Sequence, residues 1–495
     1  MANQSILFSS IKYVVHVPSL QIQKMLDPQV FKKEVSFIFH PYSMSFIEAS
    51  LQEAEIIKLL EEGVPLNKIK ELYGADSLRV INEVEEIIKD LYPKEIIKFN
   101  KPTVLWLLTS PFCNLRCRYC YTASGSAFWS SSRILNIDEL VKAVEKILDA
   151  FPTIKHIAFF GGGEPLLRLD IIKVITEKFE NNIEIFSITT NGTLINNDII
   201  EFIENYKNKF ILTLSIDGPR IVNDINRIYP DGRGTFNDIV KGIELLKEHG
   251  LMFDIQATYT REAFMLGYSM SDIAYFLSRF SPYIMLRPSD YVATLGAGER
   301  FEDAMLGFML ADYVDKSIME MLKRDPTYYD LVIAMNIAQI GRRVIKLQAC
   351  PYTSFITLNA DGRIYTCHML TDFVIGNILK TSKKDIKEKY EKALKILDIY
   401  TQKLDPRLFW MLTMQDICPA ELYGGLSYVS KGGNKKLGLR PYIRSVLENY
   451  WDALLVKIFS SARNGDLDRL YENVGKMLMA RRQGREGLSR LVNAY

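Results

Sequence analysis

Beyond residue 100, short apolar runs alternate along the chain with longer amphipathic stretches. The apolar runs predict strands at 103–108, 156–160, 183–189, 210–215, 252–258 and 283–287. Apolar residues at helical spacing between these runs predict helices at 137–150, 170–180, 197–206, 236–249 and 271–280. Strands that alternate with helices are typical of a parallel α/β sheet. The alternation alone is compatible with a barrel and with an open doubly wound sheet.

The first hundred residues have a different pattern, with one strand and three short helices. The strand is expected at 34–39 and the helices at 48–62, 66–73 and 77–91. Glycines at the ends of the first two helices, Gly63 and Gly74, are typical stop signals. The third helix is expected to bury one apolar side, formed by Val80, Ile81, Val84, Ile87, Ile88 and Leu91.

The last two hundred residues are predicted to be mainly helical, with one β-hairpin. Helices are expected at 301–323, 329–344, 441–463 and 467–482, and the methionines of the first (Met305, Met309, Met319 and Met321) are expected in the core. Asn359-Ala-Asp-Gly362 between two β-rich runs predicts the hairpin. The basic run at 481–490 is expected to be a solvated face, with an acidic peptide or a redox partner as the alternative.

Composition and charge narrow the class of protein. A chain of 495 residues is long enough for about two to four domains, and its hydrophobic and charged fractions are ordinary for globular proteins. A net charge of +2 gives no indication of nucleic-acid binding. No apolar stretch reaches ~18 residues, so no membrane span is expected. The N-terminus does not resemble a signal peptide, and the six cysteines do not form a disulfide framework, so a reducing compartment, the cytoplasm, is expected.

Three cysteines lie close together just after the first strand of the alternating region. Cys113, Cys117 and Cys120 are separated by three and then two residues, so a short loop can turn three thiolates toward one metal site. Thiolates are suitable ligands for an iron–sulfur cluster or zinc. Structural zinc sites usually have four protein ligands, whereas three thiolates on a four-iron cluster leave one iron open to a reactant. The spacing therefore favours the cluster, with zinc as the alternative.

The string Cys113-x-x-x-Cys117-x-Tyr119-Cys120 resembles the signature of the radical S-adenosylmethionine (SAM) enzymes. The resemblance implies a partial (β/α)6 barrel with a [4Fe–4S] cluster at the carboxyl ends of its strands. In that family the open iron chelates SAM, and the aromatic residue of the motif, here Tyr119, packs near the adenine. Reductive cleavage of SAM then releases a 5′-deoxyadenosyl radical that abstracts hydrogen from the substrate.

Later segments resemble the SAM-binding motifs of the same family. The loop Gly161-Gly162-Gly163-Glu164-Pro165 resembles the motif that holds the amino group of SAM. Three further segments resemble SAM contacts, and they contribute Asn191, Ser215 with Asp217, and Arg227. Relatives often have His-Asp shortly before that arginine, and this chain has Asn223-Asp224 instead.

A second cysteine set resembles the SPASM or twitch extension, which holds auxiliary iron–sulfur clusters. Cys350 and Cys367 flank the predicted hairpin, and Cys418 opens a stretch that resembles the later cysteine-rich segment. The full extension has seven cysteines and two clusters, whereas here Glu421 occupies an expected cysteine position. The resemblance therefore implies one auxiliary cluster, whose fourth ligand is His368, Glu421, water or substrate. The alternative is a degenerate region with buried free cysteines.

The N-terminal strand and helices resemble the winged-helix leader-binding domain of peptide-modifying enzymes, in which a leader peptide adds a strand to the sheet edge. A purely structural cap is the alternative. We expect five parts: a recognition domain (1–98), the radical SAM partial barrel (99–300), a helical bridge (301–345), a SPASM/twitch-like domain (346–430) and a C-terminal helical segment (431–495).

Together, these resemblances imply a radical SAM peptide maturase that crosslinks or otherwise modifies a ribosomally made precursor peptide. Its partners would be that precursor peptide with its leader and an electron donor of the flavodoxin or ferredoxin type, without nucleic acid or membrane. The alternatives are a SPASM-type oxidase acting on a protein or tetrapyrrole side chain, and a non-catalytic iron–sulfur scaffold. No catalytic acid or base is assigned, because Asp290 after the sixth strand is equally compatible with a turn residue.

Overall fold

The fold is taken from a computed structural model of the chain. It describes residues 15–31, 35–97, 101–120, 122, 124, 133–160, 162–288, 303–346, 354–366, 374–402, 410–411, 428–429, 435–436 and 441–482. Several residues with predicted roles lie outside these ranges: Gly161, Asp290, Cys350, Cys367, His368, Cys418 and Glu421.

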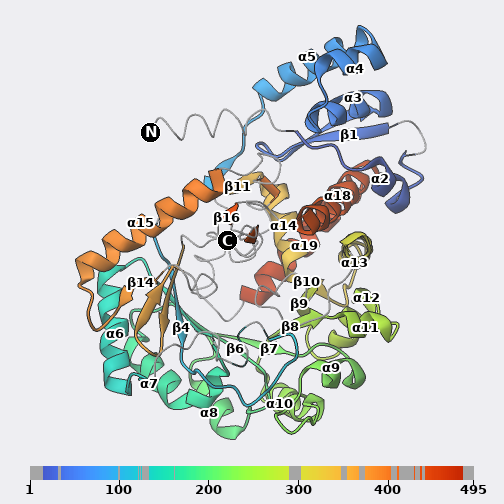
Figure 1. Cartoon of the computed structure of the whole chain (residues 1–495). Coiled ribbons are helices and arrows are strands. Elements are labelled where there is room, and N and C mark those ends of the chain that lie inside the picture. Colours follow the sequence, from blue (N-terminus) through green and yellow to red (C-terminus); the bar gives the residue numbers. More distant parts are fainter. Residues whose placement is uncertain are drawn as a thin grey trace.

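The centre of the molecule is one large, mainly parallel sheet (Figure 1). In spatial order, its described strands are β10 (Tyr329–Asp330), β9 (Tyr283–Pro288), β8 (Asp254–Tyr259), β7 (Phe210–Ser215), β6 (Ile185–Thr190), β5 (His156–Phe160), β4 (Val104–Leu108), β12 (Phe355–Asn359), β13 (Arg363–Tyr365) and β14 (Val374–Asn377). From β4 to β9 each strand pairs in parallel with the next strand in the chain. A doubly wound sheet would reverse its strand order near the middle, and this one does not.

Helices cover the outer face of this curved sheet (Figure 1). They are α6 (Ile137–Ala150), α7 (Leu169–Phe179), α8 (Asn197–Asn205), α9 (Arg220–Asn226), α10 (Phe236–Glu248), α11 (Arg261–Met265) and α12 (Met270–Leu277). Alternate strand residues such as Leu105, Ile188 and Leu286 are fully buried beneath them. The predicted partial (β/α)6 barrel is confirmed, and the predicted strands and long helices agree with the observed ones to within a few residues.

The opposite, concave face of the strands is more polar and more open. Ser215, Gln256, Thr258 and Arg287 are half-buried on alternate positions of β7, β8 and β9. Ser215 is in register with Gln256, and Thr258 with Arg287, so these side chains form a continuous polar surface. The carboxyl ends of the strands, where barrel enzymes bind their ligands, lead from this surface to the cysteine loop.

The predicted hairpin is confirmed and extends the barrel at its first strand. β12 pairs in parallel with β4, and β13 returns antiparallel to β12 through a turn in which Gly362 has a positive φ of 85°. β14 continues the sheet and leads into α15 (Lys383–Gln402), which lies beside α6 (Figure 1). The hairpin ends next to the predicted cysteines, which lie outside the described residues.

The N-terminal region contains a second strand that the sequence did not predict. β1 (Val35–His40) pairs antiparallel with β2 (Ser45–Ser50), and α3 (Leu51–Glu61), α4 (Leu66–Tyr73) and α5 (Asp76–Lys89) follow. The predicted helix start at residue 48 is therefore wrong. Ser50 accepts a hydrogen bond from the N–H of Glu53, and the Glu53 side chain accepts one from the N–H of Ser50, which fixes the true start. Ile87, expected to be buried, is 45% exposed.

The two-stranded N-terminal sheet is buried on both faces. Ile38 and Ala49 belong to a small core shared with α3, α4 and α5. Phe37 and Phe39 belong instead to the main core of the molecule. On that side the ring of Phe37 stacks on Phe459, with their centroids 4.4 Å apart. The N-terminal region is therefore packed into the rest of the chain.

The C-terminal helices α18 (Pro441–Arg463) and α19 (Leu467–Arg482) lie on the concave side of the barrel, beside α13 (Asp303–Met321) and α14 (Leu331–Arg342) (Figure 1). α18 is buried along most of its described length, and its Lys457 pairs with Asp315 of α13 at 2.8 Å.

Arg481, at the end of α19, forms a largely buried ion pair with Asp254 of β8. The first residue of the basic run is therefore not part of a solvated face.

Met321 is buried as expected, whereas Met319 is 49% exposed and lies on the outer side of α13.

Five further short elements belong to the described structure. α2 (Leu20–Leu26) packs on α18, β3 (Glu95–Ile97) pairs in parallel with β11 (Val344–Lys346), and β15 (Tyr428–Val429) pairs with β16 (Lys435–Lys436). Among the described helices, none combines the length and the hydropathy needed to cross a bilayer.

Candidate functional site

The cysteine loop begins directly beyond the carboxyl end of β4, as expected. Cys113, Cys117 and Cys120 are all partly buried free thiols. Two of the sulfur atoms are near backbone donors: the N–H of Leu115 lies 3.4 Å from the Sγ of Cys113, and that of Ser124 lies 3.2 Å from the Sγ of Cys120. The hydroxyl of Thr122 lies 3.1 Å from the same Cys120 sulfur. Donors of this kind stabilise negative charge on sulfur.

Burial works against ionisation of these thiols in the protein alone. It raises the pKa of Cys113 to about 11 and that of Cys117 to about 12. Cys120 contributes to the raised pKa of Cys113, and Cys113 and Cys120 both contribute to that of Cys117, so the three thiols lie near one another. A site that buries three neighbouring thiols needs bound cations to hold them as thiolates. Within the described ranges, no three Cys, His, Asp or Glu side chains converge as ligands of a single ion.

The glycine-rich loop after β5 packs directly against the backbone of the cysteine loop. The N–H of Gly163 donates to the carbonyl of Ser110 at 3.0 Å, and that of Glu164 donates to the carbonyl of Phe112 at 2.9 Å. A Cβ at Gly163 would lie 1.9 Å from the Phe112 carbonyl oxygen. Only glycine therefore allows the two loops to approach this closely.

Glu164 is buried and is held by groups that follow β6. Its carboxylate accepts hydrogen bonds from the Thr190 hydroxyl at 2.6 Å, the Asn191 N–H at 2.8 Å and the Leu166 N–H at 3.0 Å. Burial raises the pKa of Glu164, while these hydrogen bonds oppose the rise. A carboxylate has about four acceptor positions, so one remains for an ammonium group.

Asn191 connects the β6 loop to the cysteine loop. Its side-chain N–H₂ donates to the Oδ1 of Asn114 at 2.8 Å and lies 3.9 Å from the Sγ of Cys113. Its carbonyl oxygen accepts from the N–H and the hydroxyl of Thr193. Asn114 and Thr190 are parts of the site that sequence reasoning missed, because a single polar residue inside a motif carries no periodic signal.

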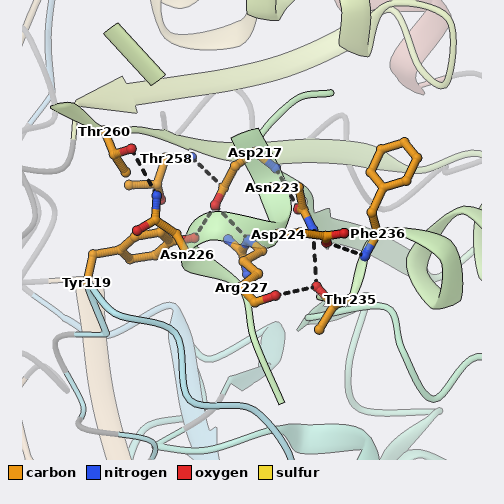
Figure 2. Close-up of polar contacts among 10 residues, drawn as sticks. All are labelled: Tyr119, Asp217, Asn223, Asp224, Asn226, Arg227, Thr235, Phe236, Thr258 and Thr260. Carbon is orange, nitrogen blue, oxygen red and sulfur yellow. Dashed lines mark hydrogen bonds and ion pairs between the residues drawn. The ribbon is translucent and has the colours of Figure 1, made fainter. Parts of the chain in front are cut away.

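Asp217 joins three segments beneath the cysteine loop (Figure 2). Its Oδ2 accepts a short hydrogen bond from the Tyr119 hydroxyl and pairs with the Nε of Arg227 at 3.0 Å. Its Oδ1 accepts from the N–H of Thr258 on β8 at 2.9 Å. The guanidinium carbon of Arg227 lies 5.6 Å from the centre of the Tyr119 ring. Asp217 and Arg227 are buried and Tyr119 is half-buried, and this environment raises the pKa of Tyr119 well above its usual value.

The segment after α9 fixes the other side of the cysteine loop. The N–H of Arg116 donates to the carbonyl of Ile228 at 2.7 Å, and that of Arg118 donates to the carbonyl of Asn226 at 3.0 Å. The Asn226 side chain donates in turn to the Thr260 hydroxyl at 3.0 Å (Figure 2). The cysteine loop is therefore held by the segments that follow β5, β6, β7 and β8.

The predicted site residues thus gather at one end of the barrel, with one difference. We expected Ser215 and Asp217 to point the same way if the strand continued, but β7 ends at Ser215. Ser215 faces the concave surface, whereas Asp217 is fully buried against Tyr119 and Arg227. Tyr119, Gly162, Gly163, Glu164, Asn191 and Arg227 lie in or around the cysteine loop.

These residues fit an iron–sulfur cluster with a bound amino acid. Two of the three thiols face hydrogen-bond donors, and the glycine loop leaves no room for a side chain where it meets the cysteine loop. Cys113, Cys117 and Cys120 would hold the cluster, and Glu164 has one acceptor position for the ammonium group of SAM.

The comparisons define the class of protein. Residues 107–279 match the radical SAM superfamily, so the barrel is a radical SAM domain, whose cofactors are a [4Fe–4S] cluster and SAM. This range includes the cysteine loop, the glycine loop, Asn191, Ser215, Asp217 and Arg227.

The relatives that the chain resembles include a maturation enzyme. The radical SAM cyclopropyl synthase TigE of Paramaledivibacter caminithermalis is 26% identical over 306 residues, which cover 52% of this chain and 62% of that protein. A cysteine-type anaerobic sulfatase-maturating enzyme of Clostridium perfringens (strain ATCC 13124) is 24% identical over 301 residues, covering 56% of this chain and 77% of that enzyme. Residues 107–279 therefore form a radical SAM domain, and about half of the chain is similar to these two enzymes.

A solved structure supports the fold independently. The structure of native anSMEcpe with bound AdoMet matches with a TM-score of 0.57 and 22% identity, covering 73% of this chain and 100% of that one. The partial barrel and its extension therefore have an experimental counterpart.

Proposed function

We propose that this protein is a radical SAM peptide maturase, which modifies a ribosomally made precursor peptide by forming a crosslink or by a related radical reaction. The observation that carries the proposal is the cysteine loop, clamped by the glycine loop and by Asn191 at the carboxyl end of the barrel. A scaffold protein without SAM chemistry would have no use for a buried carboxylate beside these thiols.

The bound cluster and SAM supply a 5′-deoxyadenosyl radical, and the chain supplies position and shielding. Glu164 holds the β6 loop against the cysteine loop and has an acceptor position for the ammonium group of SAM. Arg227 offers a guanidinium for the SAM carboxylate, and Tyr119 offers a ring near the adenine. Asn191 lies against the cysteine loop through Asn114, and Ser215 is half-buried at the end of β7.

One solved relative supports a peptide substrate. It has the same fold and is described as native anSMEcpe with bound AdoMet and Cp18Cys peptide. The half-buried polar surface formed by Ser215, Gln256, Thr258 and Arg287 is the place where we expect the reacting part of the peptide.

The N-terminal sheet offers an edge for a leader peptide. Phe39 exchanges both backbone hydrogen bonds with His16, so it cannot also bond to Phe46, its opposite residue on β2. In an antiparallel pair, every second residue directs its N–H and C=O groups away from the partner strand. Phe46 and Glu48 are two such residues, so their backbone groups point away from β1. Among the described residues, no backbone group pairs with this outer edge of β2.

An apolar cavity accompanies this edge. It has a volume of ≈380 Å³, and Met44, Phe46 and Glu48 form its wall on the side of β2. The opposite wall belongs to α14, α18 and α19, with Arg343 and Arg463 among the lining residues. An added strand would place alternate side chains in this cavity.

The enzyme hypothesis is tested by SAM cleavage. Anaerobically reconstituted protein with SAM and dithionite should release 5′-deoxyadenosine, and the Cys117→Ala variant should release none above background. Absence of product from the parent protein, at full iron content, would refute both the maturase and the oxidase functions.

The leader-binding hypothesis is tested at Glu48. Both proline and alanine remove the Glu48 carboxylate, which pairs with Arg463 at 2.6 Å. Proline in addition removes the outward N–H of an edge strand, whereas alanine keeps that donor. With a precursor peptide encoded next to this gene, Glu48→Pro should lose peptide modification and retain 5′-deoxyadenosine formation, and Glu48→Ala should retain both. Equal modification by the two variants would reject the sheet edge as the leader site.

A second candidate function is a sulfatase-type oxidase, favoured by the match to the sulfatase-maturating enzyme. It predicts modification of a short cysteine- or serine-containing peptide without any leader. Turnover of such a peptide, unaffected by Glu48→Pro, would favour this candidate over the leader-dependent maturase.

A further inference from the structure

The Asp217–Arg227 ion pair is buried directly beneath the cysteine loop (Figure 2). The side chains are 0% and 9% exposed, and their closest atoms are 3.0 Å apart. Arg227 lies opposite Cys117. The carbonyls of its neighbours Asn226 and Ile228 accept hydrogen bonds from the N–H groups of Arg118 and Arg116, which flank Cys117. Asp217 and Arg227 enclose Tyr119, which is two residues beyond Cys117 in the loop.

A buried ion pair usually contributes little net stability to a folded protein. Desolvation of the two charges often cancels their attraction, and well-packed apolar residues do as well or better. Here the loop is already held by backbone hydrogen bonds from Arg116 and Arg118, by Asn191 and by the glycine loop. Holding the loop therefore does not require an ion pair at this position.

We propose that Asp217 and Arg227 are positioning residues that set the reduction potential of the SAM-binding cluster by balancing opposite charges next to Cys117. The proposal rests on cluster binding by the radical SAM domain and is independent of the substrate. Arg227 stabilises the reduced cluster, and Asp217 limits that stabilisation while orienting the guanidinium.

The sign of each effect follows from electrostatics. Reduction adds one negative charge to the cluster, so a nearby cation raises the potential and a nearby anion lowers it. Burial strengthens both effects, because little water screens these charges. Glu164 is a further buried acid whose charge acts on Cys113 and on Arg227, and it lies on the Cys113 side of the loop. It is unchanged in all the variants below.

The test is a redox titration, followed by electron paramagnetic resonance, of the cluster signal that changes when SAM is added. Asp217→Asn should shift the midpoint potential upward, and Arg227→Gln should shift it downward. Arg227→Lys retains the cation and should stay near the parent value, and the Asp217→Asn/Arg227→Gln double variant should return toward it. Iron content and the melting temperature of each protein establish that it is folded and loaded.

An exposed pair nearby provides the matched control. Asp231 and Arg233 form an ion pair at 2.9 Å with side chains 57% and 68% exposed, so Asp231→Asn and Arg233→Gln should leave the potential unchanged. The proposal would be overturned if the midpoint potentials of Asp217→Asn and Arg227→Gln shifted in the same direction, or if neither shifted. The ion pair would then have a structural role only. Should Arg227→Gln not assemble a cluster, Asp217→Asn decides alone, because any fall in its potential contradicts the proposal.

Discussion

Gly163 shows how a single residue can decide whether the cofactor site forms. Its neighbour across the loop is the carbonyl of Phe112, which immediately precedes Cys113. Because that contact is backbone to backbone, no side chain can rotate away to make room for a methyl group. The glycine is thus required by the approach of two loops.

We therefore expect Gly163→Ala to displace the cysteine loop. The overpacking should destabilise the protein by about 1–3 kcal/mol and should reduce iron and sulfide after reconstitution several-fold. Iron analysis and thermal melting test this. Gly475→Ala in α19 is the control, because a Cβ there meets nothing within 4 Å. Full iron content in Gly163→Ala would contradict this expectation, because it would show that the cysteine loop can move to accept the methyl group and still bind the cluster.

At the same scale, sequence patterns located the site but not its connections. Cysteine spacing and the glycine loop predicted which segments converge, and the structure places them at one end of the barrel. The partners of Glu164 and Asp217, namely Thr190, Asn191, Tyr119 and Thr258, come from three different segments. Such contacts depend on three-dimensional register, so no spacing in one chain could predict them.

At the scale of elements, α18 is the helix on which the N-terminal sheet rests. Phe459 touches the rings of Phe31, Phe37 and Phe46, with centroid distances of 6.2, 4.4 and 6.2 Å. The sequence predicted α18 as a helix but gave no indication of its neighbours, because an all-round apolar helix can pack against any buried surface.

Phe459→Ala should remove the shared contact of these three rings. We expect a loss of about 3–5 kcal/mol in the free energy of unfolding, measured by denaturant titration. Phe308→Ala on α13 is the matched control, because Phe308 is 42% exposed and should cost far less. An equal effect of the two substitutions would mean that the N-terminal sheet does not depend on α18.

The missed strand β2 shows where helical periodicity misleads. Residues 48–50 continue the apolar spacing of α3, so the pattern alone extends the helix backwards. The string Ser50-Leu51-Gln52-Glu53 is a capping-box signature and marks the true start. The capping signal was present in the sequence, whereas the pairing of β2 with β1 could only be seen in the fold.

At the scale of the molecule, the N-terminal region and the C-terminal helices form one structure. His16 is buried between Glu61 of α3 and Asp452 of α18, with its ring nitrogens 3.0 and 2.7 Å from their carboxylate oxygens. Asp452 also accepts from the N–H of Ser19. Deleting the first 95 residues would therefore expose the main core, which is why point substitutions are the better test of peptide recognition.

Burial alone would lower the pKa of His16, but Glu61 and Asp452 together raise it to about 10. A group whose pKa is raised by folding stabilises the protein fully below its ordinary value, 6.5, and loses that contribution as the pH rises through about 10. His16→Gln should therefore cost about 3 kcal/mol at pH 6, because it leaves two carboxylates without their cation, and the difference from the parent should shrink toward pH 10. Unfolding free energies measured from pH 6 to 10 test this, with His249→Gln as the control, since the His249–Glu204 pair is about 40% exposed. If the difference in unfolding free energy between the parent and His16→Gln stays constant over that range, His16 is neutral in the folded protein. The contact between the N-terminal region and α18 is then held by packing alone.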